Sequence, residues 1–479
     1  MLAFLLSLFL ALGIPPPPAV VVGDSATKGD SLSTSLAVLC PQDSAVVDEI
    51  IFAGNNKTRE GVLRAELNVR EGNVLGRNDL SKKLEENRLR LFNLQLFHWV
   101  KYEVWCQDGK LKILFALQER WYFWPAPVLQ IADRNINSWL ENRDWNRIDY
   151  GLYLRYDNFR GRNEKLRVNL LHGFNRRYEF QYVKPYLTER YRKIGGSIAA
   201  SFYQSRTLEY NAVGNRLRTF RDENAFPIQR QYVSAAVIFR QNVQKQTSLS
   251  LSLHQQIISD SVLRLNPRFF YNRTRRQFAA VELTRTINLR NTFSYPLSGS
   301  YLRASIAQQV FFNEESPPIT TLFLKVADYN DLNRGFYYTY GAELQTMLGA
   351  RPSFADNAAL GYRSFVRGYE LYVVGGQHYA MLKQGLSKRV FRQDNITLPF
   401  ISNPKFNHIP LSVYLNIFTD GGYVVDRIFQ DENHLSNRFL IGSGVGLHFV
   451  TFYDRVVRLE YSYNRERERG FFIHTSFPF

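Results

Sequence analysis

Apolar and polar residues alternate along most of the chain, from about Asn146 to the C-terminal Phe479. Successive side chains of a β-strand point to opposite faces of a sheet, so this alternation predicts strands with one apolar and one mostly polar face. No helical spacing interrupts the pattern. The clearest apolar rows are Leu152/Leu154/Tyr156, Leu166/Val168/Leu170, Leu249/Leu251/Leu253 and Val457/Leu459/Tyr461/Tyr463.

A different pattern occupies residues 44–120. The β-branched run Val46–Phe52 predicts a strand, and Thr58 is placed to cap a following helix. Asn78 or Ser81 is expected to open a second helix, whose buried stripe is Leu80, Leu84, Leu91 and Leu94. Two further strands, residues 99–105 and 110–119, flank an Asp-Gly turn, which is a strong hairpin signal. The order β-α-α-β-β predicts a small α+β domain.

The N-terminus carries an apolar segment, Leu2–Ile14, that is too short to span a bilayer and ends at Pro15–Pro18. Its length is typical of a signal peptide, which we assign to residues 1–23, followed by a polar linker over residues 24–43. A short N-terminal anchor is the alternative. Export permits a disulfide, so Cys40 and Cys106, the two cysteines of the chain, are a possible pair.

Composition narrows the class of protein. No apolar run of helical membrane-spanning length follows the N-terminus, and mean hydropathy is −0.29, which together exclude a helical membrane protein but not a membrane β-barrel. The net charge of +17 is spread along the chain without a basic block, so we expect no nucleic-acid partner. Arginine-rich lumen and loop surfaces, which meet anionic lipid head groups, account for the charge instead.

A soluble sandwich would show the same alternation as a membrane barrel, so other features must decide. An export signal precedes the strands, and the sheet is too extensive for an open sandwich. The final strand places Phe471, Ile473, Thr475, Phe477 and Phe479 on one face. We therefore predict a mainly β protein: a transmembrane antiparallel β-barrel over residues 146–479, with sixteen strands favoured over twelve or fourteen. Residues 121–145 are expected to be a connector, whose aromatic run Trp121–Pro125 suits either the membrane interface or packing on the barrel rim.

The small domain resembles a POTRA domain. The residues that carry the resemblance are Ile50, Phe52, Gly54 and Asn55, then Thr58 and Leu63, then Leu91, Leu94, Leu96 and Phe97, and finally Asp108, Gly109, Leu111, Ile113 and Phe115. Such domains precede the barrel in the BamA/TamA superfamily and in two-partner secretion translocators. One copy is found here.

Two stretches of the barrel region resemble the same superfamily. Residues 151–187 are similar to its opening strands, and Val366-Arg367-Gly368-Tyr369 is similar to its V-R-G-F/Y motif. In the family this motif lies at the tip of a loop that folds into the lumen, and a terminal aromatic such as Phe479 is the signal by which outer-membrane barrels are recognised. The resemblance implies a protein of a Gram-negative outer membrane, with the POTRA domain in the periplasm, that inserts, assembles or translocates polypeptides.

The lumen loop needs a partner for its arginine, because a buried guanidinium is costly unless a carboxylate pairs with it. Alternation places Asp420 on the lumen row, which makes it the expected partner, and Glu460 is a second candidate. The strand after the loop departs from the family pattern: related sequences usually carry a glutamate there, but residues 381–389 contain Gln384 and Gly385 and no carboxylate.

Enzyme motifs are missing: the sequence has no G-x-S-x-G, P-loop or H-E-x-x-H pattern, and its His and Cys residues lack metal spacing. We therefore expect neither catalysis nor a cofactor. The expected partners are extended client polypeptides, outer-membrane lipids and periplasmic accessory proteins. A translocator of one dedicated partner and a passive porin or structural barrel are the alternative functions.

Overall fold

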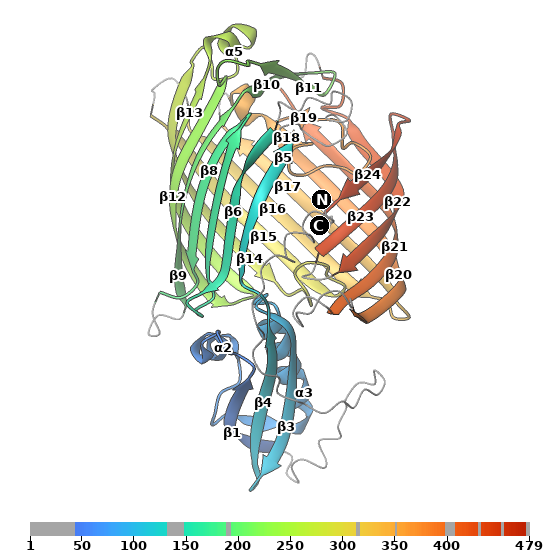
Figure 1. Ribbon diagram of the computed structural model, residues 1–479. Helices are drawn as coiled ribbons and strands as arrows, with labels where there is room; N and C mark the ends of the chain where they lie inside the picture. The colour runs from blue at the N-terminus through green and yellow to red at the C-terminus, as the bar shows by residue number, and fades with distance from the viewer. Residues whose placement is uncertain are drawn as a thin grey trace.

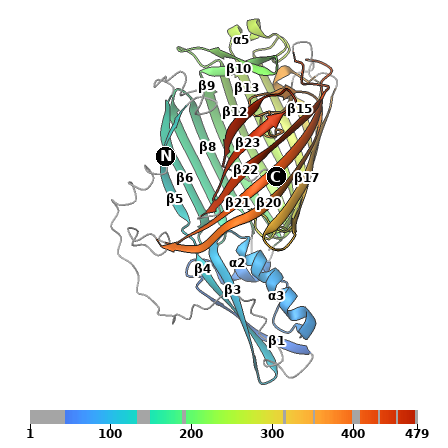
Figure 2. The same ribbon diagram turned by 90° about the vertical axis from the view of Figure 1, so that its right-hand side faces the viewer.

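The computed structural model describes residues 44–131, 148–187, 193–312, 317–349, 352–397, 408–429, 433–451 and 455–475. A small N-terminal α+β unit lies below one end of a large barrel-shaped sheet (Figures 1 and 2). None of the described helices is long and apolar enough to cross a membrane. The predicted signal peptide and linker, Cys40 and Phe479 lie outside the described residues, so the Cys40–Cys106 pairing stays a prediction.

The N-terminal unit has a four-stranded sheet in the order β2-β1-β4-β3, with β1 and β4 parallel. Its elements are β1 (Ser44–Ala53), α2 (Glu60–Glu66), β2 (Val74–Gly76), α3 (Arg77–Phe92), β3 (Phe97–Gln107) and β4 (Lys110–Glu119). The helices bury Leu63, Leu84 and Leu91 against Ile113 and Phe115 of the sheet. The predicted order is confirmed, with the short strand β2 as an addition.

Two local predictions in this unit are wrong. Thr58 does not cap α2: the N-cap residue is Arg59, without a side-chain cap, and the Thr58 hydroxyl instead donates to Glu119 at 2.5 Å. A carboxylate is the stronger acceptor, and it draws the hydroxyl away from the helix end. The second helix begins at Arg77, one residue before Asn78, with Gly76 as its N-cap.

Within the described residues, the barrel is one antiparallel sheet of sixteen strands that follow one another in chain order, which confirms the predicted strand number. The strands are β5 (Phe123–Ile131), β6 (Ile148–Phe159), β7 (Glu164–Gly173), β8 (Arg176–Lys184), β9 (Ile194–Ser205), β12 (Ile228–Asn242), β13 (Lys245–Ile258), β14 (Arg275–Asn288), β15 (Gly299–Phe311), β16 (Ile319–Asp331), β17 (Phe336–Leu348), β20 (His378–Thr397), β21 (His408–Val425), β22 (Phe439–Thr451), β23 (Arg455–Asn464) and β24 (Arg469–His474).

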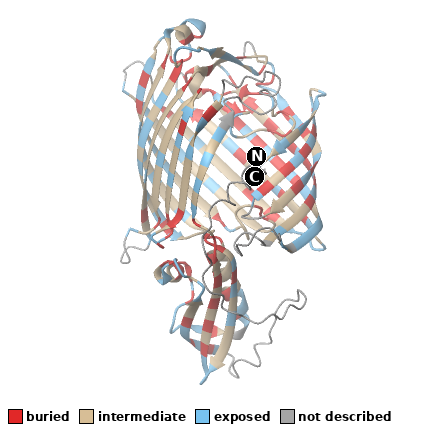
Figure 3. Ribbon diagram, viewed as in Figure 1, coloured by how far each residue is buried: buried red, intermediate tan, exposed pale blue. Residues whose placement is uncertain are grey.

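The outer surface of the barrel is apolar, as the alternation predicts. Leu249, Leu251 and Leu253 are 45%, 53% and 48% exposed, and Phe471 and Ile473 of β24 reach 77% and 72%. Buried residues gather instead inside the N-terminal unit and along β20–β23, on one wall of the barrel (Figure 3). Within the barrel, most of the closely packed side chains therefore lie on that wall.

The first barrel strand lies where we expected a connector. β5 occupies residues 123–131, within the segment 121–145, and pairs with β6 from Phe123↔Tyr156 to Ile131↔Ile148. The prediction of a bare connector is wrong because Pro125 and Pro127 interrupt the strand signal, although proline is compatible with an edge strand. β5 and β24 form the two ends of the sheet, and no ladder joins them within the described residues. We call this unpaired junction the seam.

Shorter elements lie toward the end of the barrel opposite the N-terminal unit, where Figure 1 labels α5, β10, β11, β18 and β19. They are β10 (Thr207–Val213) and β11 (Arg216–Arg221), which form a separate hairpin, α5 (Asp260–Leu265), the 3-10 helix η3 (Phe354–Asp356), β18 (Ala358–Leu360) and β19 (Val374–Gly375). We call β10–β11 the mouth hairpin.

Candidate functional site: the lumen loop

The chain between β17 and β20 folds into the barrel and carries the predicted V-R-G-Y motif. Val366 and Tyr369 are buried with Met381 and Val424 of the wall in one apolar cluster. Gly368 has φ +96°, a conformation that favours glycine. The loop also passes so close to β22 that a Cβ added to Gly442 would lie 1.7 Å from the Arg367 carbonyl oxygen. Both the side chains and the backbone of the motif therefore pack closely against the wall.

Arg367 makes the ion pair that the alternation predicts. Its Nε donates to Asp420 Oδ2 at 2.8 Å and its Nη2 to Oδ1 at 2.6 Å, in a bidentate arrangement. The backbone N–H of Arg367 donates to the same carboxylate at 3.1 Å, and the guanidinium lies 3.8 Å from the centroid of the Phe418 ring. Arg367 is 1% exposed and Asp420 0% exposed, so the pair is shielded from water.

Glu460, the second candidate partner, is shared among two arginines and two histidines. Arg458 Nη1 donates to its Oε1 at 2.6 Å, and Arg367 Nη1 lies 3.6 Å from the same oxygen. His448 and His474 approach the carboxylate at 3.4 Å. Glu460 therefore links the loop arginine to side chains of β22, β23 and β24.

The strand after the loop, which lacks the glutamate usual in the family, contacts Arg367 through a backbone group, and a buried carboxylate lies on the neighbouring strand β17. Gln384 contributes its backbone carbonyl oxygen, 3.3 Å from Arg367 Nη2, while Glu343 of β17 supplies a carboxylate. Glu343 accepts hydrogen bonds from the hydroxyls of Ser364 and Tyr379 and pairs with Lys325 Nζ at 3.0 Å. Glu343 was not among the residues predicted from the sequence, although its place on the polar row of β17 could have indicated it.

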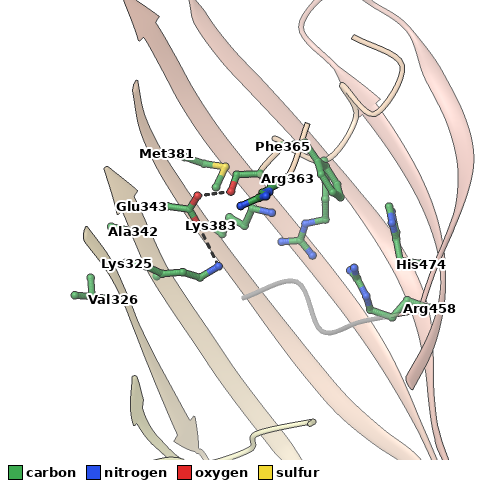
Figure 4. A pocket seen from close by; sticks show the side chains of 13 residues that line it. Lys325, Val326, Ala342, Glu343, Arg363, Phe365, Met381, Lys383, Arg458 and His474 are labelled. Atoms are coloured by element: carbon green, nitrogen blue, oxygen red, sulfur yellow. Dashed lines mark hydrogen bonds and ion pairs between the residues drawn. The ribbon is translucent and has the colours of Figure 1, made fainter. Parts of the chain in front are cut away.

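A cavity of about 150 Å³ lies between the loop and the wall (Figure 4). Lys325, Arg363 and Lys383 face it together with Glu343 and Phe365. The cavity is small and lined mostly by charged and polar side chains of the loop and the wall. Within the described residues, no group of three His, Cys, Asp or Glu side chains could hold a metal ion.

The loop also contacts the last hairpin of the barrel, next to the seam. Asn464 Nδ2 donates to the Gly368 carbonyl oxygen at 2.7 Å, and the Tyr372 hydroxyl donates to Glu468 Oε1 at 2.7 Å. The Phe365 ring stacks on His474 of β24, with centroids 5.3 Å apart. Movement of the loop would therefore break contacts with the last hairpin, which lies next to the seam.

Above the loop, the mouth hairpin is fastened by its turn residue, Asn215. Its side chain accepts a hydrogen bond from the Leu435 N–H at 2.9 Å and donates to the Val373 carbonyl oxygen at 3.3 Å. Val373 N–H donates back to the Asn215 carbonyl oxygen at 2.8 Å, and Asn215 is 0% exposed. The loop and the mouth hairpin thus form one obstruction across the barrel.

At the opposite rim, the N-terminal unit is held by buried polar contacts. Glu66 of α2 pairs with Arg240 of β12 at 2.8 Å and accepts from the Val243 N–H at 2.6 Å. Asn158 near the end of β6 donates to the Thr58 hydroxyl oxygen at 2.8 Å. Burial raises the pKa of the nearby Tyr122 hydroxyl, which stays protonated and donates to a backbone carbonyl. These contacts fix how the unit meets the barrel.

Family comparisons agree with this architecture. A model of the Omp85 superfamily domain matches residues 158–453, and a POTRA model, described as a surface antigen variable number repeat, matches residues 45–120. The chain belongs to the Omp85 superfamily, and the predicted resemblance is confirmed. It is an outer-membrane β-barrel protein with a periplasmic POTRA domain.

Two of the solved structures to which the chain is similar are a CdiB and a BamA. CdiB from Escherichia coli is 14% identical, with a TM-score of 0.51, 90% of this chain covered and 74% of that chain. BamA from Haemophilus ducreyi lacking POTRA domains 1–3 is 17% identical, with a TM-score of 0.47 and coverages of 90% and 83%. A search of curated protein sequences found no match.

Proposed function

We propose that this protein inserts or translocates polypeptides at the outer membrane, without an enzymatic step. The observation that carries the proposal is the Arg367 loop, which is bound inside a barrel whose first and last strands are not paired within the described residues. A loop held by contacts to the last hairpin can be released without unfolding the rest of the barrel. A loop that can be released in this way is suited to a barrel that changes conformation when it binds a client polypeptide.

The POTRA domain provides the entry step of this mechanism. Its sheet ends in β2 and β3, whose outer edges have no neighbouring strand in the described sheet. An extended client can add to such an edge through main-chain hydrogen bonds. The buried contacts of Glu66 and Thr58 hold the domain against the barrel rim, so a captured client is delivered next to the barrel.

A passive porin is disfavoured by the contents of the lumen. The loop, its ion pairs and the mouth hairpin occupy the barrel, and a porin needs a water-filled channel instead. Exit through the lumen requires that both the loop and the mouth hairpin move. Exit through the seam requires only separation of two edges that are unpaired within the described residues.

Deletion of residues 44–120 tests the proposal. We expect the truncated barrel to fold but to lose client assembly or export, measured as the yield of outer-membrane and secreted proteins after depletion of the wild-type chain. A matched control carries Arg64→Ala, which removes two partly exposed ion pairs and a hydrogen bond to the Ile50 carbonyl, all within the POTRA domain, and should keep activity. Full activity of the truncated barrel would refute the client role and favour the porin.

A further inference from the structure

Two arginines of the barrel, Arg176 and Arg206, stack on one aromatic ring, and we call them the arginine pair. The guanidinium carbon of Arg176 lies 4.8 Å from the centroid of the Phe226 ring, and that of Arg206 lies 5.4 Å from it. Arg176 begins β8, Arg206 follows the last residue of β9, and Phe226 lies just before β12. The mouth hairpin is inserted between β9 and β12, so the three side chains lie at the end of the barrel opposite the POTRA domain (Figure 1). The shared ring attracts both cations and holds their charges close together.

The guanidinium groups of the arginine pair have few partners within the described residues. The Nε atoms of both side chains are shielded from water and have no hydrogen-bond partner there. Arg206 donates through Nη1 to the backbone carbonyl oxygen of Glu223, whereas Arg176 makes no hydrogen bond or ion pair with any described residue. Guanidinium donors without acceptors are costly, and two like charges on one ring repel each other. The arginine pair therefore has both the donors and the charge to bind an anion.

The carboxylates of this region are bound to other groups. Glu223 pairs with Arg221 at 3.1 Å. Asp222 accepts hydrogen bonds from two backbone N–H groups of its own turn, and Asp149 accepts from the backbone and the side chain of Asn175. These acids therefore do not cancel the positive charge of the arginine pair.

The arginine pair faces the membrane rather than the lumen. Arg176, Tyr178 and Phe180 are alternate residues of β8 and share one of its faces. Phe180 is 40% exposed on the apolar outer surface, and Tyr178 is paired in register with Leu170 of β7, which is 45% exposed. Arg176 therefore continues the outward row of β8 beyond its aromatic residues, and the second arginine lies beside it on the shared ring.

Side-chain amides continue from the arginine pair across the neighbouring strands. Arg176 is paired in register with Gln204, whose amide donates to Gln229 at 2.9 Å. The outward rows of β12 and β13 carry Val233 and Leu253, which are 54% and 48% exposed, and each row changes to glutamine toward the mouth hairpin. The change from apolar to amide side chains marks the level at which the hydrocarbon core of a bilayer gives way to head groups. These glutamines, which we call the amide belt, are Gln204, Gln229, Gln231, Gln255 and Gln277.

We propose that the arginine pair binds a phosphate group of a lipid head group in the outer leaflet, and that the amide belt binds hydroxyl groups of the same head group. The POTRA domain is periplasmic, so the opposite end of the barrel, where the pair lies, is at the outer leaflet. The phosphorylated glycolipid of that leaflet is lipid A, whose phosphates are attached to sugar rings. Guanidinium groups match the oxygens of a phosphate through paired N–H···O bonds, and amides both donate to and accept from hydroxyls. The site lies outside the lumen and does not depend on client handling.

Retention of lipid A by the full-length protein tests the site. The protein is placed in phosphatidylcholine nanodiscs that contain diphosphoryl lipid A, and native mass spectrometry counts the lipid A that stays bound. Arg176→Ala/Arg206→Ala should weaken retention by about tenfold or more, because the charge-assisted hydrogen bonds to phosphate are lost. The control Arg218→Ala/Arg264→Ala removes the same charge from the mouth hairpin and α5 and should match wild type. Wild-type retention in the first variant, or an equal loss in the control, would overturn the proposal.

Two further variants separate a built site from general attraction between a basic surface and an anionic lipid. Arg176→Lys/Arg206→Lys keeps the charge but loses the guanidinium geometry, so it should retain lipid A several-fold less well than wild type. Phe226→Leu keeps both arginines but removes the ring that holds them, and it should also lower retention. Wild-type retention in both variants would show that charge alone suffices and would overturn the site. Unboiled samples of each variant, run on gels beside boiled ones, verify that the barrel is folded.

The choice of lipid and solution separates the possible ligands. Lipid A without phosphate groups should be retained no better than phosphatidylcholine, and a large excess of inorganic phosphate should not displace diphosphoryl lipid A, whose acyl chains lie against the apolar rows. Displacement would assign the arginine pair to free phosphate and overturn the lipid assignment. Retention should also persist in EDTA, because guanidinium groups rather than bridging divalent cations neutralise the phosphate. Loss in EDTA would place the lipid on carboxylates such as Glu223 through bridging metal ions and would overturn the proposal.

Discussion

Arg367 and Asp420 are 53 residues apart in the chain, yet both carboxylate oxygens of Asp420 accept hydrogen bonds from the Arg367 guanidinium inside the barrel. The pair joins the lumen loop to β21. Neither side chain is more than 1% exposed, so solvent can satisfy neither when the other is removed. Substitution of either residue is therefore expected to change the position of the loop.

Arg367→Ala should release the loop while the barrel stays folded. Removing one partner of a buried ion pair costs about 3–5 kcal/mol, because the remaining charge is left unpaired. We expect greater protease cleavage of the loop and loss of client assembly. Asp420→Ala should give a similar defect, with the arginine change more severe because Glu460 also depends on Arg367.

The double variant and a lysine variant serve as controls for this pair. Arg367→Ala/Asp420→Ala should be little worse than either single change, because both remove the same interaction. Arg367→Lys keeps the charge but loses the bidentate geometry, so it should restore only part of the protection. Fully additive defects would contradict the pairing.

Glu66→Ala should loosen the POTRA domain from the barrel rim. Arg240 and the Val243 N–H lose their buried acceptor, at a cost of about 3–5 kcal/mol in the free energy of docking. Spin labels at Lys82 on α3 and Asp331 at the end of β16, attached through unnatural amino acids, should show a broader distance distribution. The contacts that Arg64→Ala removes, with Glu60, Glu71, Ile50 and Phe52, all lie within the POTRA domain, so this variant should leave the distribution narrow. A narrow distribution in Glu66→Ala would show that other contacts suffice.

The sequence predicted those parts of the protein that depend on local pattern. Alternation placed Asp420 and Glu460 on the lumen side, and the Asp108-Gly109 pair correctly indicated a hairpin, with both residues at positive φ. β5 was missed because proline opposes strands in general but suits an edge, and whether a strand is an edge depends on the whole sheet. Thr58 was assigned a local partner, whereas its actual acceptor, Glu119, lies 61 residues away.

The contacts of the mouth hairpin illustrate the same limit. A Gly214-Asn215 turn is recognisable as a hairpin signal, and both residues have positive φ. That Asn215 would meet Val373 and Leu435 follows only once the barrel brings three distant segments together. Glu343 is a similar case, since its partners Ser364 and Tyr379 belong to the loop and the next strand.

The barrel itself should be heat-modifiable. A sixteen-stranded sheet held by continuous ladders resists detergent in the cold and unfolds on boiling, so unboiled and boiled samples should migrate differently on gels. Fractionation should recover the protein with the outer membrane. Identical migration together with recovery in the soluble fraction would rule out the membrane barrel.

Asn215→Ala should open the mouth of the barrel. The change leaves the buried Leu435 N–H and Val373 carbonyl oxygen without the Asn215 side chain, at roughly 1–3 kcal/mol for each unsatisfied group. Alanine at φ +59° adds strain of about 1–2 kcal/mol, which glycine avoids, so Asn215→Gly should show a smaller effect from the lost hydrogen bonds alone.

Two measurements check this opening. Both are needed because the mouth hairpin contacts the lumen loop at Val373, so either element could close the lumen. Trypsin added to intact cells should cleave after Arg216 or Arg218 of β11 faster in Asn215→Ala than in wild type, and single-channel conductance in planar bilayers should rise. Asn224→Ala, which changes an exposed asparagine of the same region, should alter neither. If conductance rises only when Arg367→Ala is added, the loop alone closes the lumen and the mouth hairpin is merely a cover. If Asn215→Ala leaves both cleavage and conductance at the wild-type level, the turn contact does not hold the mouth closed.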